Sequence, residues 1–429
     1  MSTVTRGHLA VATALGGAAL LALTGTAAPT AAATAHAPRT ERVSKATDGT
    51  QADAASAAPA LSADGRYVAF TSAAGNLVRG DRNGVADVFV RDLRTGRTER
   101  IAKGPASTPA LSGDGRYVVF ATSAALAKGD DNGVADIYLY DRRTHRTERV
   151  SKGHPTDWLA NSYPAISANG RVVAYATSAP DAAPGDTNER ADVIVHDRRT
   201  GRDQLVQYTT SGVLADADAL FPSLSADGRY VTFDTPAQLD PAQVQTSKTR
   251  TVYVRDLRTQ TTEQISRPTR YAYKNYADDS SISGNGRLVA FESSLYYLVP
   301  DDTNRQPDIF VYDRTRQTTV RVSTAADGTQ ADGPSQDPSL SANGRYAAFT
   351  STAGNLVPGD TNGVADIFVK DLRTGAITRV SLGTGQADGA SSAAALSADG
   401  KAAAYASTAT NLVRGDTNGV ADVFVRKTR

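Results

Sequence analysis

The chain has 429 residues, with 46 basic and 45 acidic side chains and a formal charge of +1 at pH 7. This balance provides no basic field to hold nucleic acid and no acidic tail. Cysteine is absent, which excludes disulfide bonds, thiolate metal sites and cysteine nucleophiles.

The N-terminus has the pattern of a targeting segment. A positively charged start is followed by an apolar run over residues 9–23 and then by small residues. The run is short and interrupted by two glycines, so it does not predict a permanent membrane span. We therefore interpret residues 1–37 as a signal peptide and leader, and we expect residues 38–429 to form a secreted, extracytoplasmic protein.

One phrase then recurs seven times. In its clearest copy, residues 338–351 read Pro-Ser-Leu-Ser-Ala-Asn-Gly-Arg-Tyr-Ala-Ala-Phe-Thr-Ser, and further apolar runs follow at 366–371 and 377–381. Short apolar runs that return with glycine turns at a regular spacing are typical of repeat folds. The serine before the first turn stands at Ser62, Ser112, Ser167, Ser225, Ser283, Ser341 and Ser397.

Each repeat predicts four strands. In the first repeat they fall at about residues 59–62, 67–72, 87–92 and 98–101, which are rich in β-branched and aromatic residues. An Asp-Gly or Asn-Gly turn joins the first two strands, because these residues tolerate the positive φ of a two-residue hairpin. The second and third strands are apolar at neighbouring positions, which favours burial on both faces, as in stacked blades.

The seventh repeat lacks a fourth strand, and an orphan copy of that strand, Thr-Glu-Arg-Val-Ser, stands at residues 40–44. The economical arrangement is a ring in which the N-terminal strand completes the last blade and leaves no free edge. The sequence therefore predicts an all-β fold, a seven-bladed β-propeller of four-stranded antiparallel blades. The alternative, an open solenoid, would not need its two ends to complement each other.

The phrases Ser-Ala-Asp-Gly-Arg-Tyr-Val-Ala-Phe-Thr-Ser at 62–72 and Asp-Val-Phe-Val-Arg-Asp-Leu-Arg-Thr-Gly at 87–96 resemble the WD-type repeats of TolB-like propellers. The resemblance extends over essentially the whole chain after residue 38 and implies the propeller fold. It implies no single activity, because similar repeats also form the propeller parts of serine peptidases and of some polysaccharide lyases. One departure is that TolB resembles a six-bladed propeller with an extra domain, whereas this chain has seven repeats.

Six of the seven repeats carry Asp-x-Asn-x-x-x-Asp between the second and third strands, and the fourth repeat lacks it. Alternating Asp and Asn oxygens on a glycine turn can converge on calcium, a hard cation that takes oxygen ligands. The competing interpretation is a self-contained turn held by its own hydrogen bonds. The candidate metal ligands are Asp81, Asn83, Asp87, Asp130, Asn132, Asp136, Asp186, Asn188, Asp192, Asp302, Asn304, Asp308, Asp360, Asn362, Asp366, Asp416, Asn418 and Asp422.

Two connections between repeats depart from the pattern and carry aromatic residues. Residues 154–163 contain the only tryptophan, residues 267–276 contain three tyrosines, and a tyrosine pair follows in the fifth repeat. Aromatic rings beside basic and amide side chains suit a peptide or a sugar, although they also suit a plug in the channel. The candidate ligand-binding residues are Trp158, Tyr163, Tyr271, Tyr273, Tyr276, Tyr296 and Tyr297.

No catalytic pattern stands out in the sequence. There is no Gly-x-Ser-x-Gly motif, the five histidines share no metal spacing, and the loop aspartates recur blade by blade. We therefore expect a monomeric propeller that is not an enzyme and requires no cofactor. It would bind a protein or glycan of the cell envelope through its loop-rich face. The alternative is a carbohydrate-active enzyme, a polysaccharide lyase or glycoside hydrolase, that uses acidic residues near the central channel.

Overall fold

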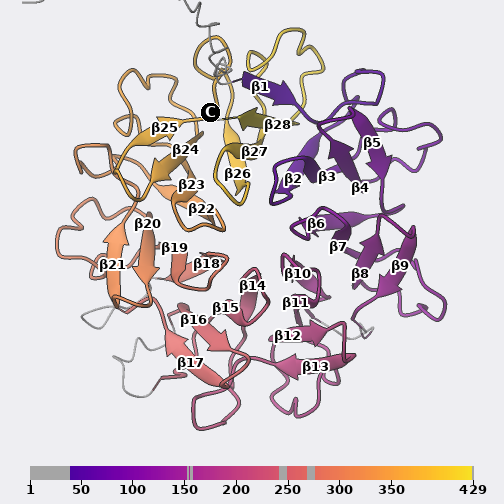
Figure 1. The fold of residues 1–429 in the computed structure, drawn as a ribbon, viewed down its shortest axis with the longest axis vertical. Coiled ribbons are helices and arrows are strands. Elements are labelled where there is room, and N and C mark those ends of the chain that lie inside the picture. The colour runs from indigo at the N-terminus through magenta and orange to yellow at the C-terminus, as the bar shows by residue number, and fades with distance from the viewer. Residues whose placement is uncertain (1–38, 152–153, 155–157, 241–248, 268–275, 428–429) are drawn as a thin grey trace, which may run out of the picture. The chain divides into compact units, whose positions relative to one another are not determined.

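The structure, a computed structural model, describes residues 39–151, 154, 158–240, 249–267 and 276–427. In these residues every regular element is a β-strand, and the strands form seven four-stranded antiparallel sheets (Figure 1). The predicted seven-bladed β-propeller is thus confirmed. The part of the chain described contains no helix that is long and apolar enough to cross a membrane. The predicted leader lies outside the described residues.

Each blade runs from an innermost strand to an outermost strand, and the innermost strands of neighbouring blades lie side by side around the axis of the ring (Figure 1). The innermost strands are β2 (Ser56–Leu61), β6 (Ala106–Leu111), β10 (Ser162–Ile166), β14 (Leu220–Leu224), β18 (Ala277–Ile282), β22 (Ser335–Leu340) and β26 (Ser391–Leu396). The second strands are β3 (Tyr67–Ser72), β7 (Tyr117–Thr122), β11 (Val172–Thr177), β15 (Tyr230–Thr235), β19 (Leu288–Ser293), β23 (Tyr346–Ser351) and β27 (Ala402–Ser407).

The outer half of each blade is built in the same way, and we number the blades 1 to 7 in the order of their innermost strands. The third strands are β4 (Asp87–Asp92), β8 (Asp136–Asp141), β12 (Asp192–Asp197), β16 (Thr251–Asp256), β20 (Asp308–Asp313), β24 (Asp366–Asp371) and β28 (Asp422–Lys427). The outermost strands are β5 (Arg97–Arg100), β9 (Arg146–Arg149), β13 (Arg202–Leu205), β17 (Thr261–Gln264), β21 (Thr318–Arg321), β25 (Ile377–Arg379) and β1 (Arg39–Arg42).

The repeated serine holds the turn between the first two strands. In blade 1 the Ser62 hydroxyl donates to a carboxylate oxygen of Asp64 at 2.6 Å and accepts the Tyr67 backbone N–H at 2.9 Å. Gly65 has a φ of +68°, a conformation that glycine adopts without strain. The same hydrogen bonds recur from blade to blade, which explains why the phrase is repeated.

The hydrophobic core lies between blades. One cluster joins Phe70 and Phe89 of blade 1 to Ala404 and Val425 of blade 7, and all four side chains are buried. The two phenylalanine rings stack with their centroids 5.7 Å apart. Because both faces of the middle strands pack against other blades, these strands are apolar at successive positions rather than at alternate ones.

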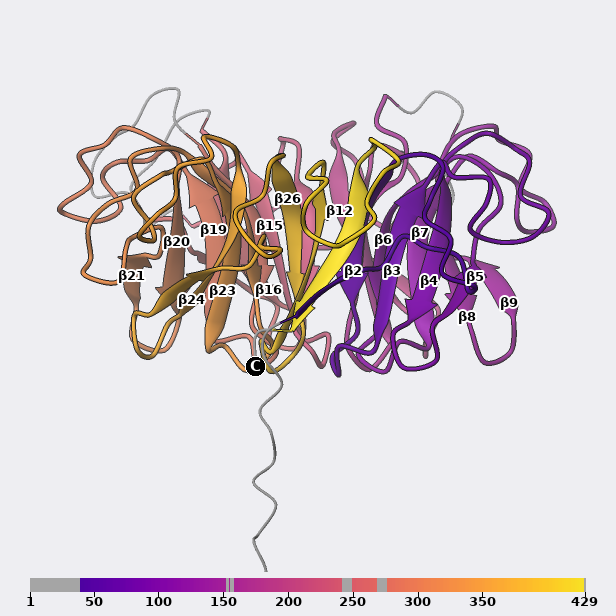
Figure 2. The same cartoon turned by 90° about the horizontal axis from the view of Figure 1, so that it is seen from above.

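The ring closes through the N-terminal strand. Strand β1 pairs antiparallel with β28, opposite Phe424 to Lys427. Beyond it, the Val43 backbone N–H donates to the Val423 carbonyl at 2.7 Å. The N-terminal strand therefore completes the last blade, as predicted from the orphan copy. Seen from the side, short turns lie at one face of the ring and longer loops at the other (Figure 2).

Candidate functional site

Every innermost strand contains the same irregularity. The pairing with the second strand shifts register in the middle, and one residue there has a positive φ although it is not glycine. Such β-bulges re-aim a side chain and are common beside functional sites, where backbone strain is retained. The seven bulge residues are Ala58, Thr108, Tyr163, Phe221, Asp279, Asp337 and Ala393.

The bulge position divides the ring into three kinds of blade. Blades 7, 1 and 2 carry small residues there, blades 3 and 4 carry aromatic rings, and blades 5 and 6 carry Asp279 and Asp337. Further acids stand beside these two. Asp278 pairs across the blade with Glu292 of β19, and Asp234 occupies the place of Glu292 in blade 4. We call Asp234, Asp278, Asp279, Glu292 and Asp337 the carboxyl cluster.

The carboxyl cluster lies toward the loop-rich end of the ring, because its members stand near the starts of innermost strands or the ends of second strands. Inner strands of the three blades are also bonded to each other. The Ser223 hydroxyl accepts the backbone N–H of Ile282 at 3.4 Å, and the Ser281 hydroxyl accepts that of Leu340 at 3.0 Å. Blades 4, 5 and 6 therefore hold the five carboxyl groups on one fixed framework.

Burial and mutual repulsion keep protons on part of this cluster. Burial, together with the charges of Asp337, Glu292 and Asp278, raises the pKa of Asp279 to about 7. Burial also raises the pKa of Asp278 to about 6, against the opposing effect of the Arg250 guanidinium. At neutral pH the cluster therefore contains carboxyl groups in both protonation states.

Glu292 accepts hydrogen bonds that favour its ionised form. The Tyr276 hydroxyl donates to Glu292 Oε1 at 2.6 Å. Burial raises the pKa of Glu292, while this hydrogen bond and one from the Asp337 backbone lower it. For Tyr276 itself, burial and the Glu292 carboxylate raise the pKa, so its hydroxyl stays protonated and keeps donating.

Arg250 connects the cluster to the aromatic blades. Its Nε donates to the buried Asp234 carboxylate at 3.1 Å, yet burial still raises the pKa of Asp234 well above its usual value. The guanidinium carbon lies 5.9 Å from the centre of the Phe221 ring. Phe221 in turn packs against Tyr163 with ring centroids 4.4 Å apart. Aromatic rings, a cation and carboxyl groups therefore follow each other around the inner edge of blades 3 to 6.

The predicted aromatic ligands divide between several places. Tyr163 and Tyr276 belong to the inner edge just described. Trp158 stands on the connection before β10 with 63% of its surface exposed. Tyr296 and Tyr297 pack on each other with centroids 3.9 Å apart, in the loop after β19. Tyr271 and Tyr273 lie outside the described residues.

Most of the Asp-x-Asn loops enclose a cationic side chain. In five blades the guanidinium of an arginine on the outermost strand lies between the first and last aspartate. In blade 6, Arg379 Nη1 is 2.6 Å from Asp360 Oδ1 and 3.1 Å from Asp366 Oδ2. The five arginines, of blades 1, 2, 5, 6 and 7, are Arg100, Arg149, Arg321, Arg379 and Arg42.

The loop asparagine is also occupied within its own loop. The amide nitrogen of Asn362 donates to Asp366 Oδ2 at 2.8 Å, and its oxygen accepts the Val364 backbone N–H at 3.4 Å. Asn83, Asn132, Asn188, Asn304 and Asn418 make the same pair of bonds. The motif therefore builds a turn that blades 1, 2, 5, 6 and 7 complete with their own cation.

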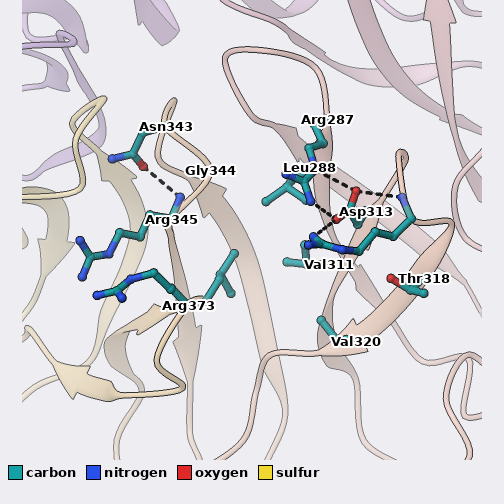
Figure 3. A pocket seen from close by; sticks show the side chains of 12 residues that line it. Arg287, Leu288, Val311, Asp313, Thr318, Val320, Asn343, Gly344, Arg345 and Arg373 are labelled. Atoms are coloured by element: carbon teal, nitrogen blue, oxygen red, sulfur yellow. Dashed lines mark hydrogen bonds and ion pairs between the residues drawn. The ribbon is translucent and has the colours of Figure 1, made fainter.

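On the opposite face, pockets open between neighbouring blades. Figure 3 shows the pocket between blades 5 and 6, where Arg287 and Arg345 stand on either side. Arg287 is held by Asp313, which accepts from its Nε at 3.0 Å. Because the equivalent arginine and aspartate pair in each of blades 1 to 6, these contacts stabilise the scaffold rather than mark one site.

Sequence reasoning missed the carboxyl cluster. It searched the loops, whereas all five acids stand inside strands, and two of them, Asp279 and Asp337, stand at the bulges of β18 and β22. The signal was present in the repeats: where Asp234 and Glu292 stand, the other five blades have Thr71, Ala121, Ala176, Thr350 and Ala406. An acid on an apolar second strand costs free energy when buried, so its presence in two adjacent blades marks them as a candidate site.

Comparison with known proteins supports the fold at low sequence identity. No family model and no curated protein matches the chain. An oligogalacturonate lyase in complex with manganese is 11% identical, with a TM-score of 0.57, and the match covers 91% of this chain and 96% of that one. An oligogalacturonate lyase from Vibrio parahaemolyticus is 10% identical, with a TM-score of 0.54, and the match covers 91% and 97%.

TolB from Acinetobacter baumannii is also similar, at 14% identity and a TM-score of 0.40, over 80% of this chain and 76% of that one. The expectation of a non-enzymatic binding propeller is corrected by the two lyases, because they are enzymes that match nearly the whole chain. By fold, the chain is a seven-bladed β-propeller.

Proposed function

We propose that this protein is a carbohydrate-active enzyme that hydrolyses glycosidic bonds at the carboxyl cluster of blades 4 to 6. The observation that carries the proposal is the set of neighbouring carboxyl groups whose surroundings favour different protonation states. Glycoside hydrolysis needs such a pair, one carboxylic acid to protonate the leaving oxygen and one carboxylate to assist the attacking water.

Asp279 is the proposed acid. Its pKa of about 7 leaves about half of the carboxyl groups protonated at neutral pH, which suits proton donation under physiological conditions. Glu292 is the proposed base, since Tyr276 donates to it and stabilises its charge. Asp279 would give its proton to the glycosidic oxygen as the bond breaks. Glu292 would take a proton from the water that adds to the anomeric carbon.

The surroundings of the pair favour a neutral glycan. Tyr163 and Phe221 present aromatic surface on which a sugar ring can pack. A polyuronate would bring its own carboxylates next to Asp278 and Asp337, and the nearby cation, Arg250, is already paired with Asp234. Like charges at close range disfavour binding, so we expect uncharged sugars at this site.

A polysaccharide lyase is the second candidate, favoured by the fold that the chain shares with oligogalacturonate lyases. The manganese of one of those lyases does not fit the residues found here. In the described ranges no group of three or more acidic, histidine or cysteine side chains is arranged to hold a metal ion. For either reaction we propose an extracytoplasmic location, with a glycan of the cell envelope as partner.

The test is to incubate the protein with a panel of neutral and uronic acid polysaccharides and to measure two products. Hydrolysis releases reducing ends without a new double bond, whereas a lyase leaves an unsaturated sugar that absorbs ultraviolet light. We expect reducing ends from a neutral glycan and no ultraviolet signal. Release of unsaturated uronides would establish the lyase instead, and no release from any glycan would refute both reactions.

A further inference from the structure

The third blade has an Asp-x-Asn loop without the arginine that fills the other five. Leu205 stands on its outermost strand where blade 2 has Arg149 and blade 6 has Arg379. In the described residues, neither Asp186 nor Asp192 of this loop forms an ion pair with a basic side chain. Two carboxyl groups therefore face a position that a cation occupies in the sister blades.

One carboxylate oxygen of the buried aspartate of this loop also lacks a hydrogen-bond donor. Asp192 is fully buried, and its Oδ2 has no hydrogen-bond partner among the described residues. Its Oδ1 accepts only the Asn188 amide, at 3.1 Å. Blades 2, 5, 6 and 7 differ here, because a serine hydroxyl and the arginine both reach the equivalent aspartate; blade 6 uses Ser381 and Arg379.

A second, independent observation is the side chain of Gln207. It occupies the position of that serine, whose side chain reaches the loop aspartate in four sister blades. Gln207 is fully buried, and within the described ranges neither its amide oxygen nor its amide nitrogen has a partner. Burying an amide without hydrogen bonds is costly, so an unpartnered oxygen at this place indicates that a ligand belongs beside it.

Other residues around this loop also differ from those of the sister blades in ways that favour a cation. Asp218 adds a carboxylate beside the loop, and this carboxylate accepts the Ala191 backbone N–H at 3.1 Å. Sister blades 6 and 7 place a glutamine against the arginine, as Gln51 does with Arg42 at 2.5 Å. Blade 3 has Leu214 at that bridge position. Both members of the arginine and glutamine pair are thus replaced together.

We propose that the loop of blade 3, alone among the six, binds one calcium ion, with Asp186, Asp192 and the Gln207 amide oxygen as side-chain ligands. In blade 7 the Arg42 guanidinium also donates to the Gly415 carbonyl. The equivalent carbonyl in blade 3, that of Gly185, would be the fourth oxygen ligand. Two carboxylates with neutral oxygens, completed by water, match the hard and flexible coordination of calcium. Magnesium demands a more regular octahedron and holds its water more tightly.

The test is isothermal titration calorimetry with calcium chloride on the chelator-treated full chain, together with thermal unfolding in chelator and in millimolar calcium. We expect one calcium ion per chain and a rise in Tm of about 2 °C or more, because binding to the folded state alone stabilises it. Magnesium at the same concentration should give a smaller rise.

Three variants locate the site. Leu205→Arg supplies the guanidinium of the sister blades and should abolish calcium binding while raising the Tm in chelator. Arg149→Leu makes the opposite change in blade 2 and should weaken that blade without removing the calcium ion of blade 3. Gln207→Ser restores the sister residue and should weaken calcium binding at least tenfold with the fold intact.

The proposal fails if the wild-type chain takes up no calcium at millimolar concentration, since the two aspartates would then share a proton instead. It also fails if Leu205→Arg binds calcium as well as the wild-type chain does. Because the loop joins the second and third strands of blade 3, either result leaves glycan hydrolysis at blades 4 to 6 untouched.

Discussion

The hydroxyl of Tyr276 donates a 2.6 Å hydrogen bond to Glu292, an acid on a second strand where five other blades have threonine or alanine. Tyr276→Phe removes this donor and little volume. We expect kcat for glycan hydrolysis to fall about tenfold, because the base then holds its proton more tightly and is less often ionised. The acidic limb of the pH profile of kcat should move to higher pH. An unchanged profile would show that Tyr276 has only a structural role.

Asp279→Asn should separate activity from stability. Loss of the acid should lower the rate of hydrolysis by about 10²–10⁴-fold. The same change removes a carboxyl group that burial and three other acids disfavour, so the free energy of unfolding at pH 8 should rise by about 1–2 kcal/mol. Asparagine tolerates the positive φ of this bulge. Thr108→Asn at the same position of blade 2 is the matched control and should leave activity unchanged.

The stability of the protein should depend on pH in a defined direction. Asp278 and Asp279 have pKa values of about 6 and 7 in the folded protein, above their usual value of 3.8. The folded state thus holds protons that the unfolded chain releases, and the free energy of unfolding should fall as the pH rises from about 4 to about 7. Melting temperatures across this range measure it, and a rising Tm would contradict the assignment.

A second set of carboxylates affects the stability of the protein at lower pH. The Arg287 guanidinium lowers the pKa of Asp313, and the Arg171 guanidinium lowers that of Asp197 to about 2. A lowered carboxyl pKa gives stability that is present above about pH 4 and lost as the pH falls toward 2. The side chain of Asp197 is 23% exposed and that of Asp313 is 10% exposed, and their arginine partners are more exposed, so the effect of each pair is reduced by solvent screening.

Substrate binding should depend on the aromatic bulge residues. Phe221→Ala introduces the residue that blades 1 and 7 carry at the same bulge, so the backbone should keep its conformation. We expect KM for the glycan to rise about tenfold with kcat changed less than twofold, as for a residue that binds substrate and transition state equally. A fall in kcat at constant KM would assign Phe221 to the chemistry instead.

The closing strand should carry much of the stability of the ring. Val43 is fully buried and bonded to Val423 of the last strand. Val43→Asp places an unpaired charge in this joint and should cost about 3 kcal/mol or more of unfolding free energy, measured by urea titration. Glu41→Ala, on the same segment, removes a partly exposed ion pair with Lys45 and should change it by no more than about 0.5 kcal/mol.

The fold was predictable from the sequence because the same strand and turn pattern recurs seven times. The Ser-x-Asp-Gly turn, the apolar second and third strands and the orphan copy at residues 40–44 each indicate the same architecture, and each appears in the structure. Repetition lets local signals that are weak in one copy reinforce each other.

The site was less predictable because its residues depend on contacts between blades. The sequence shows that Asp279 and Asp337 are acids, but not that a bulge places them beside Glu292. It also shows an Asp-x-Asn loop, but not that Arg379 on another strand reaches into it. Aligning the outermost strands of the repeats would have revealed Leu205 as the exception.

The pairing of β1 with β28 also sets an order of events during folding. The partner of β1 is the last strand of the ring, almost 400 residues later in the chain, so β1 must wait while the other blades form. Contacts between such distant segments form slowly, and until then the edges of β1 and β28 are open to strands of other chains. Ring closure is thus the step at which a slow or crowded folding reaction would turn to aggregation.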